Sequence, residues 1–147
     1  MSLQFQIKTF NDLTVNELYS ILQLRSEVFV VEQNCVYQDI DGKDKKAMHV
    51  VGTFEGEIVA YARIFKKGDY FDNASIGRVV VSADCRTRKW GYNLMETAIQ
   101  AIETHFNETK ITISAQLYLQ KFYESLGFTK VSEMYLEDDI PHIEMLK

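Results

Sequence analysis

The sequence predicts a single α/β domain in which a mixed, mostly antiparallel sheet is flanked by helices. The chain has 147 residues, which suits one domain with a real core. Its composition, 46% hydrophobic and 25% charged, is that of a globular protein. Apolar residues repeat at periods that switch between strand and helix, which gives the order β-α-β-β-β-α-β-α-β-β.

The first third of the chain predicts a strand, a helix and a loop. Apolar and polar residues alternate over 3–10, the period-two pattern of a half-buried strand. Thr14 followed three residues later by Glu17 is a capping box, and apolar residues keep helical spacing behind it as far as Phe29. Residues 37–47 are polar, acidic and contain a glycine, which indicates a surface loop.

The middle of the chain predicts a hairpin and a buried strand. Two β-rich runs within 48–65 flank the sequence "EGE", whose glycine suits a tight turn. After a loop over 66–75, the run 76–81 contains "VVV" and is too uniformly apolar for a half-solvated strand. We therefore expect a central strand that is covered on both faces.

The remaining elements are two helices and three strands. Helical spacing over 94–102 predicts the second helix, and "KITISA" (110–115) the next strand. A short helix within 117–128 is expected to stop at Gly127. The tail 128–146 divides around "EDDIP" into two more strands.

Composition narrows the function classes. The net charge of -5 argues against a nucleic-acid-binding face. No apolar window is long enough to cross a bilayer, and the start does not read as a secretory leader. Cys35 and Cys85 lack metal-site spacing and we expect free thiols. A cytoplasmic protein without a metal, a membrane or a nucleic-acid partner is expected.

A cluster of basic residues lies where the buried strand meets the second helix, although the chain as a whole is acidic. Arg86, Arg88 and Lys89 lie in what the pattern indicates is the first helical turn, and Gly91 lets a ligand approach the backbone. Free N–H groups and the dipole at a helix start favour a phosphate, and arginine suits paired oxygens. A solvated surface turn is the alternative, although the dipole makes the position unfavourable for cations.

The sequence around this basic cluster resembles that of a known family. "RVVV", a basic Arg-x-x-x-x-Gly turn and then "FYESLGF" resemble the GNAT superfamily of acyl-CoA-dependent N-acetyltransferases. More narrowly, "LQLRSEVFVVEQNCVYQDIDGKD", "IGRVVVS", "LQKFYESLGF" and "EDDIPHIEM" look like its ElaA branch, over most of the chain between Leu22 and Met145.

The resemblance implies a GNAT-like sheet that is splayed open beside the strand 76–81, with acetyl-CoA as co-substrate in the splay. The pantetheine arm would hydrogen-bond like an extra strand, and the basic turn would hold the pyrophosphate. The residues that the resemblance assigns to acetyl-CoA are Val79, Val80 and Val81 for pantetheine, and Arg86, Thr87, Arg88, Lys89, Trp90, Gly91 and Tyr92 for pyrophosphate.

Lys89 departs from the family's usual turn, Arg/Gln-x-x-Gly-x-Gly/Ala, at the first glycine. If this position required a positive φ, a lysine would cost about 1 kcal/mol or more. We expect instead an ordinary first-turn helical residue, whose N–H stays available and whose ammonium adds charge.

The chemistry needs a donor for the thioester oxygen and an acid for the departing thiolate. The strand amide near Val80 can serve the oxygen, and the resemblance makes Tyr123 the acid. The pattern alone favours a core tyrosine, because Leu119, Phe122 and Leu126 share its helical face.

Acceptor-binding residues are weaker predictions. His49 and His142 are candidates for binding the acceptor or acting as a base, and each could equally be structural. Glu32 could bind a cationic acceptor, or pair with Arg25 two helical turns earlier.

The acidic loop Asp39-x-Asp41-Gly42-x-Asp44 does not match the EF-hand spacing. It is expected to be a solvated turn whose rim attracts a polyamine or a lysine.

The predicted function is acetyl transfer from acetyl-CoA to a primary amine of a small molecule or peptide, by direct attack. A non-catalytic acyl-CoA-binding or interaction module is the alternative, and a nucleic-acid-binding domain is a third reading that the charge disfavours. The acceptor and the oligomeric state are left open, a homodimer included.

Overall fold

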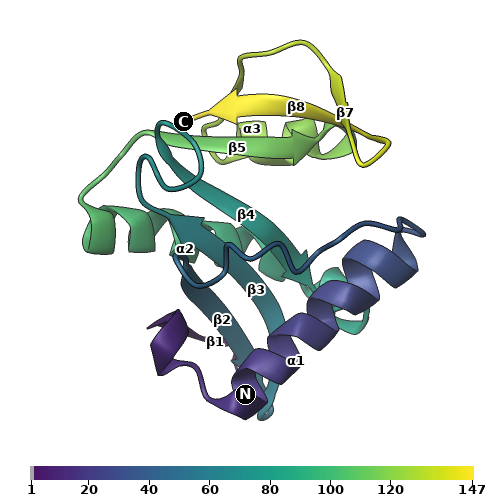
Figure 1. The fold of residues 1–147 in the computed structure, drawn as a ribbon, viewed down its shortest axis with the longest axis vertical. Helices are drawn as coiled ribbons and strands as arrows, with labels where there is room; N and C mark the ends of the chain where they lie inside the picture. Colours follow the sequence, from purple (N-terminus) through teal and green to yellow (C-terminus); the bar gives the residue numbers. More distant parts are fainter. Residues whose placement is uncertain (1) are drawn as a thin grey trace.

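The computed structural model describes residues 2–147 and contains one eight-stranded sheet (Figure 1). Along the sheet the order is β1-β2-β3-β4-β5-β8-β6, and β7 also pairs with β8. Only the β4–β5 pair is parallel among the described strands, so the mixed, mostly antiparallel sheet is confirmed. The strands are β1 Gln4–Thr9, β2 Met48–Phe54, β3 Glu57–Phe65, β4 Ala74–Val81, β5 Ile111–Gln116, β6 Thr129–Lys130, β7 Tyr135–Glu137 and β8 Ile140–Leu146.

The helices follow the predicted order with shifted ends. In α1, the capping box is present: Thr14 Oγ1 accepts from the Glu17 N–H at 3.0 Å, and Glu17 Oε1 accepts from the Thr14 N–H at 2.9 Å. None of the helices described over residues 2–147 is long and apolar enough to cross a membrane. The helical elements are η1 Phe10–Asp12, α1 Val15–Arg25, the π-helical η2 Ser26–Glu32, η3 Ala83–Arg88, α2 Trp90–Phe106, η4 Leu117–Leu119 and α3 Gln120–Ser125.

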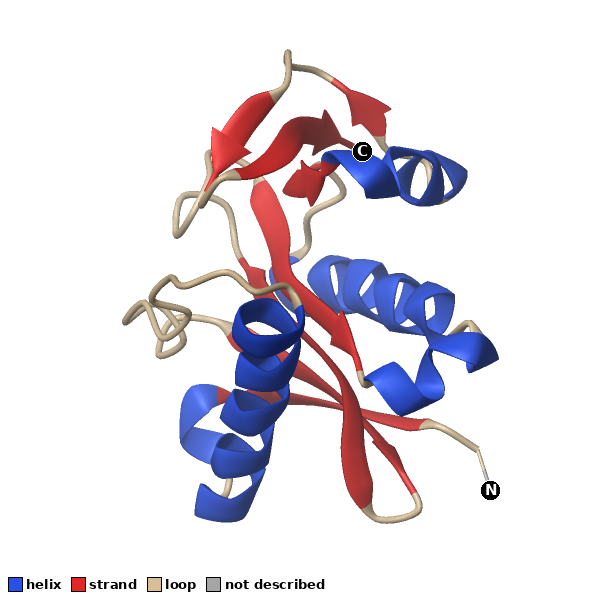
Figure 2. Ribbon diagram, turned by 90° about the vertical axis from the view of Figure 1, so that its right-hand side faces the viewer, coloured by secondary structure: helices blue, strands red, loops and turns tan. Residues whose placement is uncertain are grey.

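Helices α1 and α2 lie on opposite faces of the sheet (Figure 2), and a hydrophobic core lies beneath each of them. On β3, Ala60 and Ala62 belong to the core beneath α2, whereas Tyr61 belongs to the core beneath α1. This alternation follows from the period of two in a strand. β4 contributes to both cores, through Ile76 on the α2 side and Val80 on the α1 side. The prediction of a central strand covered on both faces is confirmed.

Two predicted boundaries were wrong. The second helix starts at Trp90, because the basic residues before it form the separate 3-10 segment η3. The C-terminal tail contains three strands instead of two, since the two-residue β6 also pairs with β8. Gly127 ends the α3 region with a φ of +96°, as predicted.

The sheet opens between β4 and β5. These strands pair only at Ala74–Ile111 and Ser75–Thr112 among the described residues, and they then separate (Figure 1). β4 has a β-bulge beside this opening. Gly77 of β4 pairs with Arg63 of β3 and Val80 pairs with Tyr61, so β4 advances three residues where β3 advances two. The extra residue lets Arg78 adopt a φ of +50° and redirects the backbone beside the opening.

Candidate active site between strands β4 and β5

A cavity of about 130 Å³ lies where β4 and β5 separate. One wall comes from β3 and β4 together with the loop before β2. The other comes from β5, α3 and the β7–β8 hairpin. Among the lining residues are Arg63, Ser75, Arg78 and Val79 on the first wall, and Ser114, Tyr123, Glu137 and His142 on the second.

Tyr123 lies on the second wall and is 7% exposed. Its ring packs edge-on against Phe122 and Phe128, with centroids 5.1 and 6.1 Å away. Burial raises the pKa of Tyr123, which keeps the phenol protonated in neutral solution. Tyr123 is therefore both a core residue and a cavity residue, and its role as the acid stays a prediction.

Val79, Val80 and Val81 form the end of β4 beside the opening. Val80 and Val81 pair with Tyr61 and Ala60 of β3. Toward β5, no described strand pairs with this part of β4. An extended ligand could therefore add along that edge by backbone hydrogen bonds. The assignment of the three valines to pantetheine stays a prediction.

Lys89 adopts a left-handed conformation, with φ 59° and ψ 30°. The expectation of an ordinary first-turn helical residue was therefore wrong. The physical reason is that Lys89 joins two helices: it ends η3 and also precedes the first residue of α2. Its N–H donates to the Arg86 carbonyl at 3.3 Å, so this donor already has a partner.

The two arginine side chains of the basic turn already have partners. Arg86 forms a two-point ion pair with Glu32, in which Nη2 lies 3.0 Å from Oε1. The guanidinium of Arg88 stacks on Phe54 and Trp90, at 4.8 and 5.1 Å from the ring centroids.

Three further residues of the turn are placed as follows. Thr87 is exposed, Gly91 lies against the Phe122 ring, and the Tyr92 hydroxyl lies 2.7 Å from Ser125 Oγ. The contact with phosphate that was predicted for this turn stays a prediction.

Glu32 does not pair with Arg25, so that alternative was wrong. The ion pair with Arg86 instead links the end of η2 to η3, and Glu32 is not among the residues that line the cavity. Its neighbour Gln33 does line the cavity. Glu32 as an acceptor-binding residue stays a prediction.

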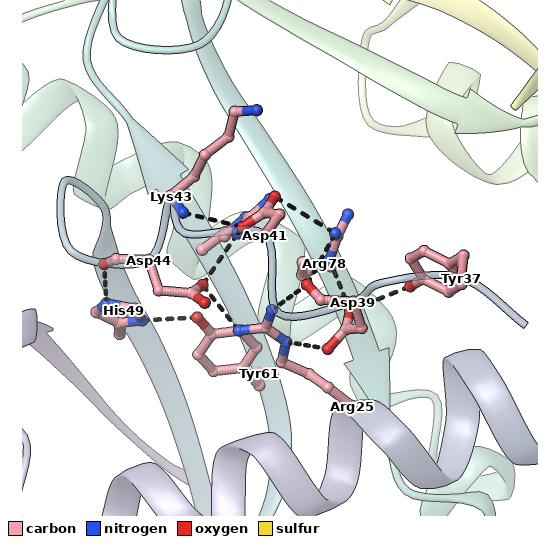
Figure 3. Close-up of polar contacts among 10 residues, drawn as sticks. Arg25, Tyr37, Asp39, Asp41, Lys43, Asp44, His49, Tyr61 and Arg78 are labelled. Atoms are coloured by element: carbon pink, nitrogen blue, oxygen red, sulfur yellow. Dashed lines mark hydrogen bonds and ion pairs between the residues drawn. The ribbon is translucent and has the colours of Figure 1, made fainter. Parts of the chain in front are cut away.

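Arg25 belongs to a buried charge network that the sequence analysis missed (Figure 3). The expectation of a solvated acidic turn was wrong, because Asp39 and Asp44 are buried. Asp44 Oδ1 accepts from Nη1 of Arg25 at 2.8 Å and from Nη1 of Arg63 at 2.9 Å. Both arginines are at most 1% exposed and need counter-charges.

The other two aspartates complete the charge network. Asp39 pairs with Nε of Arg25 at 3.0 Å and with Nε of Arg78 at 2.7 Å. Asp41 Oδ2 accepts from Nη2 of Arg63 at 2.6 Å. Burial opposes ionisation of Asp41, but the hydrogen bond and charge of Arg63 outweigh it and hold the pKa of Asp41 well below its usual range. The network fastens the acidic loop to the sheet.

His49 lies beside this charge network (Figure 3). It is not among the residues that line the cavity. Its Nε2 lies 3.0 Å from the Asp44 carbonyl oxygen and its Nδ1 lies 2.6 Å from the Tyr61 hydroxyl. Because a carbonyl only accepts, Nε2 carries the proton and Nδ1 accepts from Tyr61. Burial lowers the pKa of His49. The geometry gives His49 a structural environment and does not support an acceptor-binding role.

His142 lies on the cavity wall, as does Tyr123. Its Nδ1 lies 2.7 Å from the Ile140 carbonyl oxygen, and its Nε2 lies 3.4 Å from Oε2 of Glu137. Glu137 was not predicted as a site residue, and its only signal in the sequence was its place in "EDDIPHIEM". His142 as an acceptor-binding residue or base stays a prediction.

The structure thus brings together some of the predicted residues and separates others. Tyr123, Val79 and His142 meet around the cavity. Glu32 and Arg86 meet outside it, and His49 lies beside the charge network. A buried arginine within the apolar strand sequence "YARIF" was the signal that could have indicated the network, because such a residue requires acidic partners.

Comparison with known proteins identifies relatives over the whole chain. Residues 9–147 match the model of the acetyltransferase (GNAT) domain family. Protein ElaA of Escherichia coli is 45% identical over 147 residues, which cover 99% of this chain and 96% of ElaA. A UPF0039 protein of Schizosaccharomyces pombe is 44% identical over 146 residues, which cover 98% of this chain and 96% of that protein. The crystal structure of an acyl-CoA N-acyltransferase from Pseudomonas aeruginosa, 45% identical, superposes with a TM-score of 0.94 over 99% of both chains.

Proposed function

Because the chain belongs to the acetyltransferase (GNAT) domain family, we propose that it transfers an acetyl group from acetyl-CoA to a primary amine. The acceptor would be a small molecule or a peptide, and it would attack the thioester directly. Holding both substrates in one cavity would supply much of the acceleration, through proximity and orientation.

The observation that carries the proposal is the separation of β4 from β5 with Tyr123 on the wall of the resulting cavity. The unpaired edge of β4 offers backbone groups to a strand-like substrate arm. The cavity beside that edge has space for the reacting end of the thioester.

Each step of the transfer has a candidate group in this chain. The backbone N–H near Val80 would donate to the thioester oxygen as it becomes negative. The Tyr123 phenol, kept neutral by burial, would donate its proton to the departing thiolate of CoA.

Binding measurements test the first half of the proposal. We expect acetyl-CoA and CoA, but not an oligonucleotide, to raise the melting temperature of the protein by mass action. Stabilisation by the oligonucleotide alone would contradict the proposal and favour a nucleic-acid-binding domain.

Turnover tests the second half and separates an enzyme from an acyl-CoA-binding module. Thiol release would be followed with a panel of small amines, polyamines, amino acids and peptide N-termini. We expect one class to release CoA with formation of the acetylated amine. Tight acetyl-CoA binding without turnover on the whole panel would favour the module.

A further inference from the structure

Four polar side chains of β5, β7 and β8 contact one another, and three of them, Ser114, Glu137 and His142, line the second wall of the cavity. Ser114 Oγ lies 2.5 Å from the Tyr135 hydroxyl and donates to Oε1 of Glu137 at 3.2 Å. Glu137 Oε2 points to the ring of His142, at 3.4 Å from Nε2. The His142 ring also stacks on Tyr135, with centroids 6.2 Å apart. These contacts fix the position of Glu137 relative to His142.

The tautomer of His142 is set by its backbone contact. Nδ1 lies 2.7 Å from the Ile140 carbonyl oxygen, and a carbonyl only accepts, so Nδ1 carries a proton. In the neutral ring Nε2 is therefore the nitrogen with the free lone pair. His49 has the opposite arrangement, because there the carbonyl contact is made by Nε2.

Two acceptors consequently face each other: the Nε2 lone pair of neutral His142 and the carboxylate of Glu137. Two acceptors that face each other need a proton donor between them, and a water molecule or an N–H group of a ligand can supply it. The His142 ring is 6% exposed and lies on the cavity wall, so such a ligand would reach it from the cavity. A primary ammonium carries one positive charge and three N–H donors, which satisfies both atoms.

We propose that His142 and Glu137 bind the ammonium group of the acceptor and that His142 Nε2 removes its proton. This inference rests on the proposed function and names the chemistry of its acceptor: an unhindered primary aliphatic amine. Phe29 and Phe65 also line the cavity and suit an aliphatic chain, and about 130 Å³ holds the amine end of such a molecule.

Acetyl transfer begins with the loss of a proton from the bound ammonium group. The ammonium N–H bond breaks, its proton bonds to Nε2, and the amine keeps the electron pair. That pair forms the C–N bond to the thioester carbon, and the C–S bond then breaks. Tyr123 gives its proton to the sulfur and recovers one from the new amide nitrogen, while His142 releases its extra proton to water. Glu137 stabilises the imidazolium that forms in between.

The arginines of the opposite wall already pair with aspartates. Tyr135 stacks on His142, and Glu144 lies near Tyr135. The titratable and charged groups that line the cavity together with His142 are Glu137 and Asp138 of the β7–β8 hairpin, Tyr123 of α3, Cys35 and Tyr37 of the loop before β2, Tyr70 of the loop before β4, and Arg63 and Arg78 of the opposite wall.

Kinetics of His142→Asn test the base role, since the asparagine amide can keep the hydrogen bond to the Ile140 carbonyl. With the best amine of the panel, we expect kcat/KM for the amine to fall about 100-fold at pH 7, with acetyl-CoA affinity unchanged. The loss should shrink toward pH 10, where a much larger fraction of the amine in solution is neutral than at pH 7. The matched control is His105→Asn, on the exposed face of α2. The base role would be overturned if His142→Asn kept the kcat/KM of the wild type at pH 7, or if its kcat/KM fell by the same factor at every pH.

Glu137→Gln tests the ammonium site separately. The amide keeps an oxygen for the Ser114 hydroxyl but removes the charge, so we expect KM for the amine to rise about tenfold. Glu133→Gln, an exposed position in the same hairpin region, is the control. An unchanged KM in Glu137→Gln would overturn the assignment of Glu137.

A measurement that needs no turnover distinguishes failure of this inference from failure of the proposed function. In protein with 15N-labelled histidine, we expect His142 to show the Nδ1–H tautomer, its signals being identified by their loss in His142→Asn. The n-butylammonium ion should shift the Nε2 resonance, whereas tetramethylammonium, which is charged but has no N–H, should not. An Nε2–H tautomer, or equal responses to the two ions, would overturn the ammonium site whatever the outcome of the amine panel.

Discussion

The two walls of the cavity differ in how their charged residues and their histidines are paired, although Ser75 Oγ and Arg63 Nε on the first wall have no hydrogen-bond partner among the described residues. On the first wall, the arginines and aspartates of the charge network neutralise one another, and His49 beside them has both ring nitrogens bonded. On the second wall, Tyr123 and His142 line the cavity, and Nε2 of His142 lies 3.4 Å from Oε2 of Glu137. A polar group with all its partners inside the protein contributes to the fold, whereas one that still needs a partner is available for a ligand.

This difference explains why burial alone does not identify a functional residue. His49 and His142 are both buried on strands, and their sequence contexts do not rank them. The hydrogen bonds of their two ring nitrogens distinguish the two histidines. The following changes test the contrast between the walls, starting with the largest expected effect.

Breaking the charge network on the first wall should have the largest effect. Asp44→Asn leaves the buried Arg25 and Arg63 with one carboxylate fewer, and we expect the free energy of unfolding to fall by about 3 to 5 kcal/mol. Urea unfolding followed by circular dichroism measures this. Asp72→Asn, at an exposed position, should change the stability little. Equal stability of the two variants would show that the network is not structural.

On the second wall, Tyr123→Phe should affect turnover and leave stability nearly unchanged. Loss of the acid should lower kcat about 100-fold without changing the affinity for acetyl-CoA. The control is Tyr118→Phe, whose ring is exposed one turn earlier. Undiminished kcat with intact binding would rule out Tyr123 as the acid.

The two walls should also differ in the pH dependence of stability. His49 is buried and its pKa is lowered, so below about pH 6.5 the unfolded chain binds a proton that the folded protein does not. Its contribution to stability is present above that pH and is lost as the pH falls. We expect His49→Gln to flatten the decline in unfolding free energy between pH 6.5 and 5, as measured by chemical denaturation. An unchanged slope would contradict a neutral His49, and His105→Gln is the control.

The smallest effect is expected at Lys89, beyond the end of the first wall. A glycine there removes the cost of a left-handed lysine, so Lys89→Gly should stabilise the protein by about 1 kcal/mol. Differential scanning calorimetry would show a rise in melting temperature of a few degrees. Weaker acetyl-CoA binding in Lys89→Gly and Lys89→Ala, but not in Lys89→Arg, would assign the ammonium a role in phosphate binding. A lower melting temperature in Lys89→Gly would contradict the strain.

The strand and helix order was predictable because each element carries its own local signal. The alternation in β1, the Thr14–Glu17 capping box and Gly127 act within a few residues of each other in the chain. The "VVV" of β4 indicated burial on both faces because no polar face remains in it. Tyr123 could be singled out because its surrounding motif resembles the family's, although its helical spacing favoured a core role.

The partners of charged residues were decided by the tertiary structure. Glu32 meets Arg86 across 54 positions, and Arg25 meets Asp44 across 19, at distances that chain spacing does not specify. The conformation of Lys89 likewise depends on how η3 joins α2. The sequence by itself determined which segments are strands and helices, since local sterics and apolar periodicity suffice for that. Only the packed sheet decided which histidine is enclosed and which faces the cavity, because that depends on hydrogen-bond partners brought from distant strands and loops.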